Sequence, residues 1–389
     1  MKALCWYGAH DVRVENVPDP GILNPRDIIL KTTLTTICGS DLHIYDGYIP
    51  TMVPGDVIGH EFMGEVVEVG KGISTLKKGD RVIVPSIIAC GHCYFCQQNL
   101  WSLCDNSNPN AWMAEAAYGF SPAAIYGFSH LFGGYAGSHA DYIRVPFADI
   151  GPVKIPYELT DEQVLFLSEA FPAGYMAADN CDIQSGQTVA VWGAGAVGLF
   201  AMKSARLLGA DRVIAIDRIP FRLQMAREQC RAETLNYEEI DVVEELKQMT
   251  GGRGPDACID AVGMEADSST FLGAYDRVKQ FARLETDRPG VLRQAIKACR
   301  KGGTVSITGF YGGFIDKVPM GAAFNKGLQF RMGQVHAQKY THMLLERVQR
   351  GAIDPSFVIT HRMSLEDTPR GYKLFKDRSD NCIRVVFKP

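Results

Sequence analysis

Four cysteines stand close together in the segment CGHCYFCQQNLWSLC, at positions 90, 93, 96 and 104. Four thiolates joined by short loops can surround one tetrahedral Zn²⁺ at about 2.3 Å each. Disulfide bridges, an iron–sulfur cluster and a fortuitous cysteine-rich loop are the alternatives, although iron–sulfur clusters usually use other spacings. Four thiolates would close the coordination shell, so a zinc ion held by Cys90, Cys93, Cys96 and Cys104 is expected to be structural.

The other cysteines argue against a disulfide framework. The chain has eleven cysteines in all, an odd number, and those outside the cluster are scattered singly. The N-terminal residues lack an apolar run typical of a signal peptide, and no stretch approaches the roughly 20 apolar residues of a membrane span. We therefore expect a cytoplasmic protein with reduced thiols and no membrane partner. The net charge of -4 gives no general electrostatic reason to bind nucleic acid.

A glycine-rich turn, GAGAVG at residues 193–198, directly follows the apolar run TVAVW. Between a strand and a helix, this pattern lets the backbone approach a dinucleotide pyrophosphate at the helix N-terminus. Asp217 ends the next apolar run, where a carboxylate can bond the adenosine ribose and favours NAD over NADP; Arg218 is the counter-argument. The residues expected to contact the dinucleotide are Gly193, Gly195, Ala196, Val197, Gly198, Asp217, Arg218 and Val262.

Three more stretches carry side chains that can do chemistry: CGSDLH at 38–43, GHEFMG at 59–64 and LSEAFP at 167–172. Taken singly, a Cys, a His or a Glu is most often structural. Together they offer a thiolate, an imidazole and carboxylates, which are the donors that Zn²⁺ takes in catalytic sites.

Two kinds of element must position these groups. Up to about residue 155 the 389-residue chain shows short β-branched runs broken by Gly and Pro, which predicts a mostly β domain. After about residue 170, strand-like and helix-like segments alternate, which predicts a doubly wound parallel sheet. The tail from about 338 returns to a helix and a closing strand. The fold class is therefore expected to be α/β, with two domains.

In this order, these motifs resemble the medium-chain zinc-dependent alcohol dehydrogenase family over almost the whole chain. The segments 118–152 and 274–303 look like the branch that contains glutathione-independent formaldehyde dehydrogenase and formaldehyde dismutase. The resemblance implies a GroES-like β-rich catalytic domain at 1–168, a Rossmann NAD-binding domain at 169–337, and a return to the catalytic domain at 338–389. It also implies a homo-oligomer, a tetramer or a dimer.

By that resemblance, Cys38 and His60 are ligands of a second, catalytic zinc, and Glu61 is a carboxylate able to approach the metal. The third ligand departs from the family pattern. Many relatives have a cysteine there and the formaldehyde branch has an aspartate, whereas this chain has Glu169. One thiolate, one carboxylate and a neutral imidazole leave the Zn²⁺ site neutral. Two thiolates and a neutral imidazole would do the same. Cys181 lies too far along the chain to replace Glu169.

The implied activity is hydride transfer between NAD and a small primary alcohol or an aldehyde hydrate such as that of formaldehyde. Ser40 is the expected first proton acceptor and His43 the residue that passes the proton on; His43 as a merely structural polar residue is the alternative. Ile49, Ser86 and Leu103 are candidates for the substrate pocket. A general primary-alcohol dehydrogenase, an S-(hydroxymethyl)glutathione dehydrogenase, a non-catalytic relative and a zinc-dependent nucleic-acid-binding protein are the rival interpretations.

The connection at residues 263–303 is longer than a simple strand–helix–strand crossover needs. It looks like the formaldehyde branch's insertion beside the adenosine end of the cofactor. If it folds over NAD, release slows and a retained NADH would return its hydride to a second aldehyde. A surface insertion without contact to NAD is the alternative.

Overall fold

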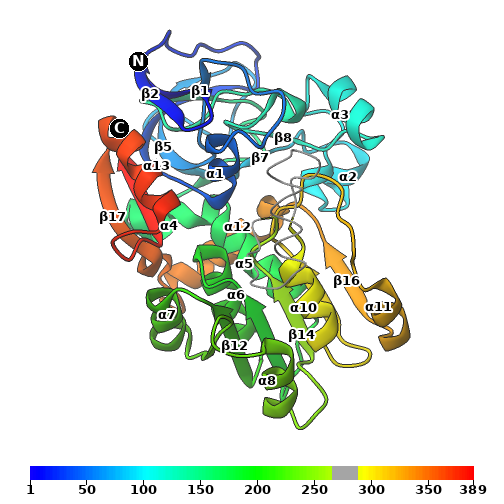
Figure 1. Ribbon diagram of the computed structural model, residues 1–389. Helices are drawn as coiled ribbons and strands as arrows, with labels where there is room; N and C mark the ends of the chain where they lie inside the picture. The colour runs from blue at the N-terminus through cyan, green and yellow to red at the C-terminus, as the bar shows by residue number, and fades with distance from the viewer. Residues whose placement is uncertain (265–287) are drawn as a thin grey trace. The chain divides into compact units, whose positions relative to one another are not determined.

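The computed structural model describes residues 1–264 and 288–389, coloured from blue to red in Figure 1. These residues form two compact units, Met1–Pro172 with Val335–Pro389, and Ala173–Gln334. The boundaries expected from the sequence lie after residues 168 and 337. The structure differs at Glu169, which that division assigned to the second domain and which lies in the first unit. Most of the connection predicted to cover the cofactor, residues 265–287, lies outside the described residues.

The first unit is rich in β-structure, as the sequence predicts. Its largest sheet runs in the order β10-β6-β5-β3-β18-β17, with β9 also paired to β3, and smaller sheets are β2-β1-β4 and β7-β8. The strands are β1 (Lys2–Gly8), β2 (Asp11–Asn16), β3 (Ile28–Thr36), β4 (Asp56–Val57), β5 (Glu61–Val69), β6 (Arg81–Val84), β7 (Ile87–Ile88), β8 (Ala124–Ile125), β9 (Tyr142–Val145), β10 (Val153–Lys154), β17 (Ile359–Ser364) and β18 (Arg384–Lys388).

The pairing of β3 with β5 is the feature that positions the site. The strands run antiparallel with Thr36 opposite Glu61 and Thr32 opposite Gly64. A Cβ on Gly64 would lie 2.3 Å from the carbonyl oxygen of Lys31, so only glycine allows this close approach. Inward-facing residues such as Leu30 and Phe62 pack into a fully buried core. The end of β3 and the start of β5 are thereby held side by side.

Short helices join and cover these strands. They are α1 (Gly39–Tyr45), α2 (Tyr94–Gln97), η1 (Trp101–Leu103), α3 (Ala111–Tyr118), η2 (His130–Phe132), α4 (Asp161–Val164), η3 (Leu165–Ser168), α12 (Ala337–Gln349), η4 (Pro355–Val358), η5 (Leu365–Asp367) and α13 (Thr368–Asp377). Helix α5 (Ala170–Asp179) begins in the first unit and ends in the second.

The second unit is a six-stranded sheet in the order β13-β12-β11-β14-β15-β16, with every neighbouring pair parallel. This confirms the predicted doubly wound α/β fold. Its strands are β11 (Thr188–Trp192), β12 (Arg212–Asp217), β13 (Glu233–Asn236), β14 (Ala257–Asp260), β15 (Thr304–Ile307) and β16 (Gln329–Met332). Its helices are α6 (Ala196–Leu207), α7 (Pro220–Cys230), α8 (Val242–Met249), α10 (Gly290–Ala298) and α11 (Met320–Lys326).

Helices cover both faces of this sheet (Figure 1). Helix α6 contacts α7, and on the other face α8 contacts α10. All five residues of β11 are buried, as a central strand between two helical layers requires. The carboxyl ends of β11 and β14 are therefore the open edge on which loops can form a binding site.

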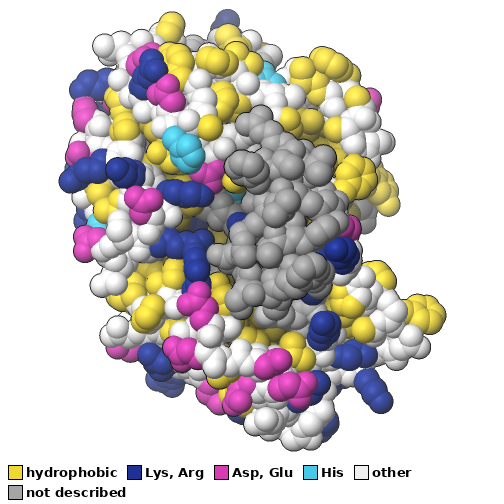
Figure 2. Space-filling model, in the orientation of Figure 1, with side chains coloured by type: hydrophobic (Ala, Val, Ile, Leu, Met, Phe, Trp, Pro, Cys, Tyr) yellow, Lys and Arg dark blue, Asp and Glu magenta, His cyan; other side chains and the backbone are white. Residues whose placement is uncertain are grey.

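The surface carries charges of both signs. On the face shown in Figure 2, lysine and arginine side chains are interspersed with aspartates and glutamates. Across the described ranges, no helix combines the length and apolar character that crossing a bilayer demands.

Candidate active site and metal centres

Cys38 and His60 are brought together by the β3–β5 pair. Cys38 follows the end of β3 and is the N-cap residue of α1, with extended backbone dihedrals. His60 immediately precedes β5, whose first residue, Glu61, lies opposite Thr36. Both side chains are buried. Cys38 and His60 are 22 positions apart in the chain, and the register of β3 against β5 brings them to one point.

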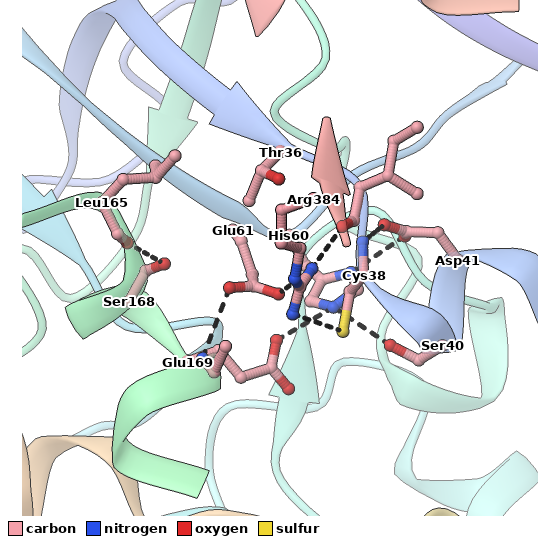
Figure 3. A network of polar contacts seen from close by, with 12 residues as sticks. Thr36, Cys38, Ser40, Asp41, His60, Glu61, Leu165, Ser168, Glu169 and Arg384 are labelled. Carbon is pink, nitrogen blue, oxygen red and sulfur yellow. Dashed lines mark hydrogen bonds and ion pairs between the residues drawn. The ribbon is translucent and has the colours of Figure 1, made fainter. Parts of the chain in front are cut away.

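Glu169 arrives at the same point from a different element, the junction between η3 and α5. Its carboxylate Oε2 lies 2.9 Å from Nε2 of His60, and its side chain is 17% exposed. Cys38, His60, Glu61 and Glu169 each offer a ligand atom, and these atoms all lie within 4.8 Å of one another. The structure thus brings together the residues that the sequence assigned to a catalytic metal (Figure 3).

Asp41 fixes the orientation of the imidazole. Its Oδ1 lies 3.0 Å from Nδ1 of His60, and its Oδ2 accepts a 2.8 Å hydrogen bond from the backbone N–H of Cys38. The Nε2 atom of His60 is thereby directed towards Glu169. Burial opposes a charged imidazole, but the carboxylates of Asp41 and Glu169 outweigh it and hold the pKa of His60 well above its usual value. A metal ion at Nε2 would take the place of that proton.

Glu61 has a different partner, the guanidinium of Arg384 at the start of β18. The Arg384 Nη1 atom lies 2.9 Å from Oε1 of Glu61, and both side chains are almost completely buried. Oε2 of Glu61 accepts a 3.3 Å hydrogen bond from the backbone N–H of Ala170. Arg384 also donates to the carbonyl oxygen of Ile37 and lies 3.8 Å from Sγ of Cys38 through Nη2. Figure 3 shows this network beside His60.

The donor set fits zinc. A thiolate, an imidazole and a carboxylate are accepted Zn²⁺ ligands, and three of them leave a fourth position open. Of the two glutamates, Glu169 is the better third ligand, because its carboxylate faces Nε2 of His60. Both carboxylate oxygens of Glu61 already have partners in Arg384 and Ala170. Burial raises the pKa of Glu61 and Arg384 opposes that rise, so the pair balances charge beside the site.

The residues expected to move the proton both lie on α1. Ser40 Oγ is 3.1 Å from Nε2 of His60, so its hydroxyl lies beside a candidate metal ligand. His43 follows three residues later, is 5% exposed, and shares the helix face of Ser40. A relay from Ser40 to His43 stays a prediction.

The second cluster consists of Cys90, Cys93, Cys96 and Cys104, whose sulfur atoms lie within 4.8 Å of one another. All eleven cysteines are free thiols, so no disulfide competes for this cluster. Backbone N–H groups already point at the sulfurs, from Cys90 to Cys104 at 3.2 Å and from Cys93 to Cys90 at 3.4 Å. Burial opposes ionisation of Cys90, but such N–H groups outweigh it and lower the pKa of this thiol to about 6. Burial instead raises the pKa of Cys96 and Cys104, so the fit to a structural zinc comes from four sulfur donors within reach of one ion.

In the second unit, the glycine turn has the conformation that the motif requires. Gly193 follows β11 with a φ of +91°, and Gly195 is the N-cap residue of α6. A Cβ on Gly198 would lie 1.8 Å from the carbonyl oxygen of Gly193, so the third glycine is needed for the helix to approach the turn. Binding of dinucleotide phosphates at the start of α6 stays a prediction.

Asp217 ends β12 and lies under this turn. Its carboxylate accepts 2.8 Å and 2.7 Å hydrogen bonds from the backbone N–H groups of Ala194 and Arg218. The guanidinium of Arg218 is paired with Glu238 at 3.1 Å. Arg222 of α7 reaches the turn instead, 3.8 Å from the Cβ position of Gly195. Contacts of Asp217, Ala196, Val197 and Val262 with a cofactor stay predictions.

Three residues that the sequence did not single out take part in these sites: Asp41, Arg384 and Arg222. Asp41 had a visible signal, because it stands three residues after Cys38, where a carboxylate can cap α1. Arg384 had a weaker one, a charge in the apolar run IRVVF. A buried arginine needs an acidic partner, but the sequence does not say which.

Comparison with known proteins finds matches along the whole chain. The family model "Alcohol dehydrogenase GroES-like domain" matches residues 24–156, and the model "Zinc-binding dehydrogenase" matches residues 196–278. A zinc-type alcohol dehydrogenase-like protein of Bacillus subtilis, AdhB, is 43% identical over 100% of both chains. Glutathione-independent formaldehyde dehydrogenase of Pseudomonas aeruginosa is 32% identical, covering 96% of this chain and 94% of that protein.

Among solved structures, the alcohol dehydrogenase TADH of Thermus sp. ATN1 superposes with a TM-score of 0.83 and 32% identity, over 100% of this chain and 99% of that one. The β-rich unit is thereby identified as GroES-like and the parallel sheet as Rossmann-like. The sequence-based assignment is confirmed: the chain belongs to the medium-chain, zinc-type alcohol dehydrogenase family.

Proposed function

We propose that the chain is a zinc- and NAD-dependent oxidoreductase that transfers hydride between NAD and a small primary alcohol or an aldehyde hydrate. The observation that carries this proposal is the buried group of Cys38, His60 and Glu169, with donor atoms within 4.8 Å of one another. Retention of this ligand set argues against a non-catalytic relative. The glycine turn at the start of α6 supports the cofactor assignment.

In this proposal each residue has a definite task. Cys38, His60 and Glu169 hold the catalytic zinc, which supplies a Lewis acid that lowers the pKa of an alcohol group. Asp41 keeps His60 in the tautomer that carries its proton on Nδ1, which leaves Nε2 free to bind metal. NAD supplies the hydride acceptor.

Removal of the substrate proton is assigned to Ser40, whose Oγ lies 3.1 Å from His60 Nε2. His43, on the same face of α1, then carries the proton towards solvent. Ser40→Ala should therefore lower the rate of hydride transfer, measured as NADH formation.

The substrate class is formaldehyde or another small primary alcohol or aldehyde. Support comes from the formaldehyde dehydrogenase relative and from the carboxylate at position 169 in place of a cysteine. The residues of this site could also serve a general primary-alcohol dehydrogenase or an S-(hydroxymethyl)glutathione dehydrogenase. Only the pocket separates them, so the substrate is decided by assay.

The deciding assay is a panel of alcohols and aldehydes, with and without glutathione and with and without added NAD, in which both acid and alcohol products are measured. We expect NADH formation from small primary alcohols and hydrated formaldehyde without glutathione. Equal amounts of acid and alcohol formed without added NAD would show that the protein retains its cofactor. Activity only with glutathione would support the S-(hydroxymethyl)glutathione alternative, and no hydride transfer with any substrate would contradict the proposal.

We also propose that the protein is a cytoplasmic homo-oligomer, a dimer or a tetramer. Strand β16 supports self-association, because it is the last strand of its sheet and Met332, which ends it, is 63% exposed. The outer edge of such a strand offers unpaired backbone N–H and C=O groups to a second copy, although β16 also carries Gln329 and Arg331. Light scattering that returns the mass of one 42.8 kDa chain would contradict the oligomer.

A further inference from the structure

The strand order of the second unit marks one place where a ligand can bind. From β11 the chain proceeds outwards to β12 and β13, and then returns to β14 and proceeds the other way to β15 and β16. The carboxyl ends of β11 and β14 therefore flank a topological switch point. In open parallel sheets, ligands bind in the crevice at this point. The turn after β11 is the glycine turn; the segment after β14 forms the opposite wall.

This opposite wall, residues 261–264, packs closely against its neighbours. A Cβ on Gly193 would lie 2.8 Å from a methyl carbon of Val262, so the two walls nearly touch. A Cβ on Gly263 would lie 2.4 Å from the carbonyl oxygen of Phe310, which belongs to the segment after β15. The N–H of Met264 donates to that same oxygen at 2.9 Å. The wall has little room to shift without changing the crevice.

One buried carboxylate holds the wall in shape. Asp260, the last residue of β14, is completely buried. Its Oδ1 accepts hydrogen bonds from the N–H groups of Val262 at 2.9 Å and Gly263 at 3.0 Å. Its Oδ2 accepts from the hydroxyl of Tyr311 at 2.8 Å. Asp260 thus ties the turn after β14 to the segment after β15.

The three donors need an acceptor, and a charged carboxylate is a costly one in a buried position. Burial raises the pKa of Asp260, and the two N–H groups and the Tyr311 hydroxyl oppose that rise. A group that is costly to bury and shapes a ligand crevice is a candidate for a functional role.

We propose that Asp260 and Tyr311 are positioning residues for the dinucleotide: they hold Val262 and Gly263 as a preformed wall of the cofactor crevice. The inference rests on the proposed NAD-dependent function and assigns neither residue to the chemical step. A preformed wall lowers the ordering cost of binding, so its loss should weaken cofactor affinity. The rate at saturating cofactor should stay almost unchanged.

The test is titration of the zinc-loaded, full-length protein with NADH, followed by its fluorescence, together with steady-state kinetics and melting temperatures. Tyr311→Phe keeps the ring and removes one hydrogen bond, so the Kd for NADH should rise about two- to tenfold. Asp260→Ala removes all three hydrogen bonds and should raise the Kd further. Asp260→Asn keeps an acceptor for the N–H groups and should recover part of the loss.

The matched control is Asp256→Asn. Asp256 precedes the amino end of the same strand and binds Arg300 at 2.6 Å and the N–H of Thr188 at 2.8 Å. The Asp256→Asn variant should have a lower melting temperature than the wild type and an unchanged Kd for NADH. Variants of Asp260 and Tyr311 that lower the melting temperature but leave the Kd and KM for the cofactor at wild-type values would overturn the inference. Failure of the wild-type protein to bind NADH at all would instead overturn the proposed function.

Discussion

Replacing Arg384 should reveal how strongly the buried Glu61–Arg384 pair supports the candidate active site. The two side chains are 0% and 2% exposed, and the ion pair spans 2.9 Å. Breaking a buried pair by removing one partner typically costs about 3–5 kcal/mol, because the remaining charge stays buried. Arg384→Met also leaves the carbonyl of Ile37 without its donor, which adds about 1 kcal/mol.

Protonation of Glu61 should limit the loss of unfolding free energy in Arg384→Met. Its pKa is already raised by burial and held back by Arg384, so removal of the guanidinium should let Glu61 take up a proton at neutral pH. We therefore expect about 3–4 kcal/mol for Arg384→Met and a similar loss for Glu61→Gln. The double variant should cost clearly less than the sum, because neither buried charge is then left alone.

The assay is urea unfolding of the four proteins at one fixed free zinc concentration, with the coupling energy taken from the double-mutant cycle. Lys2, whose pair with Glu366 is exposed, gives a control: Lys2→Met should leave the urea midpoint almost unchanged. Single-variant losses below about 1 kcal/mol that add without coupling would refute the reasoning.

Three further predictions concern single residues. Glu169→Gln should keep the fold but weaken zinc binding and lower activity; if Glu61→Gln instead removes the catalytic zinc while Glu169→Gln keeps it, the ligand assignment is reversed. Cys93→Ala should lower the melting temperature or split the oligomer before it affects turnover, and unchanged stability would contradict a structural zinc. His139 is completely buried, which lowers its pKa to about 4, so the neutral form favours folding. That stability is fully present above the unfolded value of about 6.5 and is lost as the pH falls towards about 4. Acid unfolding curves of His139→Gln should be flatter between these values than those of the wild type, and identical slopes would count against this prediction.

The parts of the site that the sequence predicted depend on short-range spacing. The four thiols of Cys90 to Cys104 lie on one loop, and the glycines of 193–198 lie on one strand–helix turn, so their proximity follows from chain connectivity. The alternation of strands and helices after residue 170 likewise predicts the parallel sheet without knowledge of its contacts.

The sequence did not predict the role of Arg384 or the unit to which Glu169 belongs. Both depend on contacts between distant parts of the chain. Arg384 reaches Cys38 across 346 positions because β18 pairs with β3, and no local pattern encodes that pairing. Glu169 belongs to the first unit because η3 packs against β5, although the pattern of secondary structure changes just after it. The pairing of β18 with β3 and the packing of η3 against β5 therefore place Arg384 and Glu169.

The most direct test of the account is the zinc content of active protein, measured by elemental analysis on the wild type and on His60→Ala. Wild-type protein should contain two zinc ions per chain. His60→Ala should retain the ion of the cysteine cluster, keep its fold and lose hydride transfer. One zinc or fewer in fully active wild-type protein, or normal hydride transfer by His60→Ala, would contradict the proposed catalytic centre.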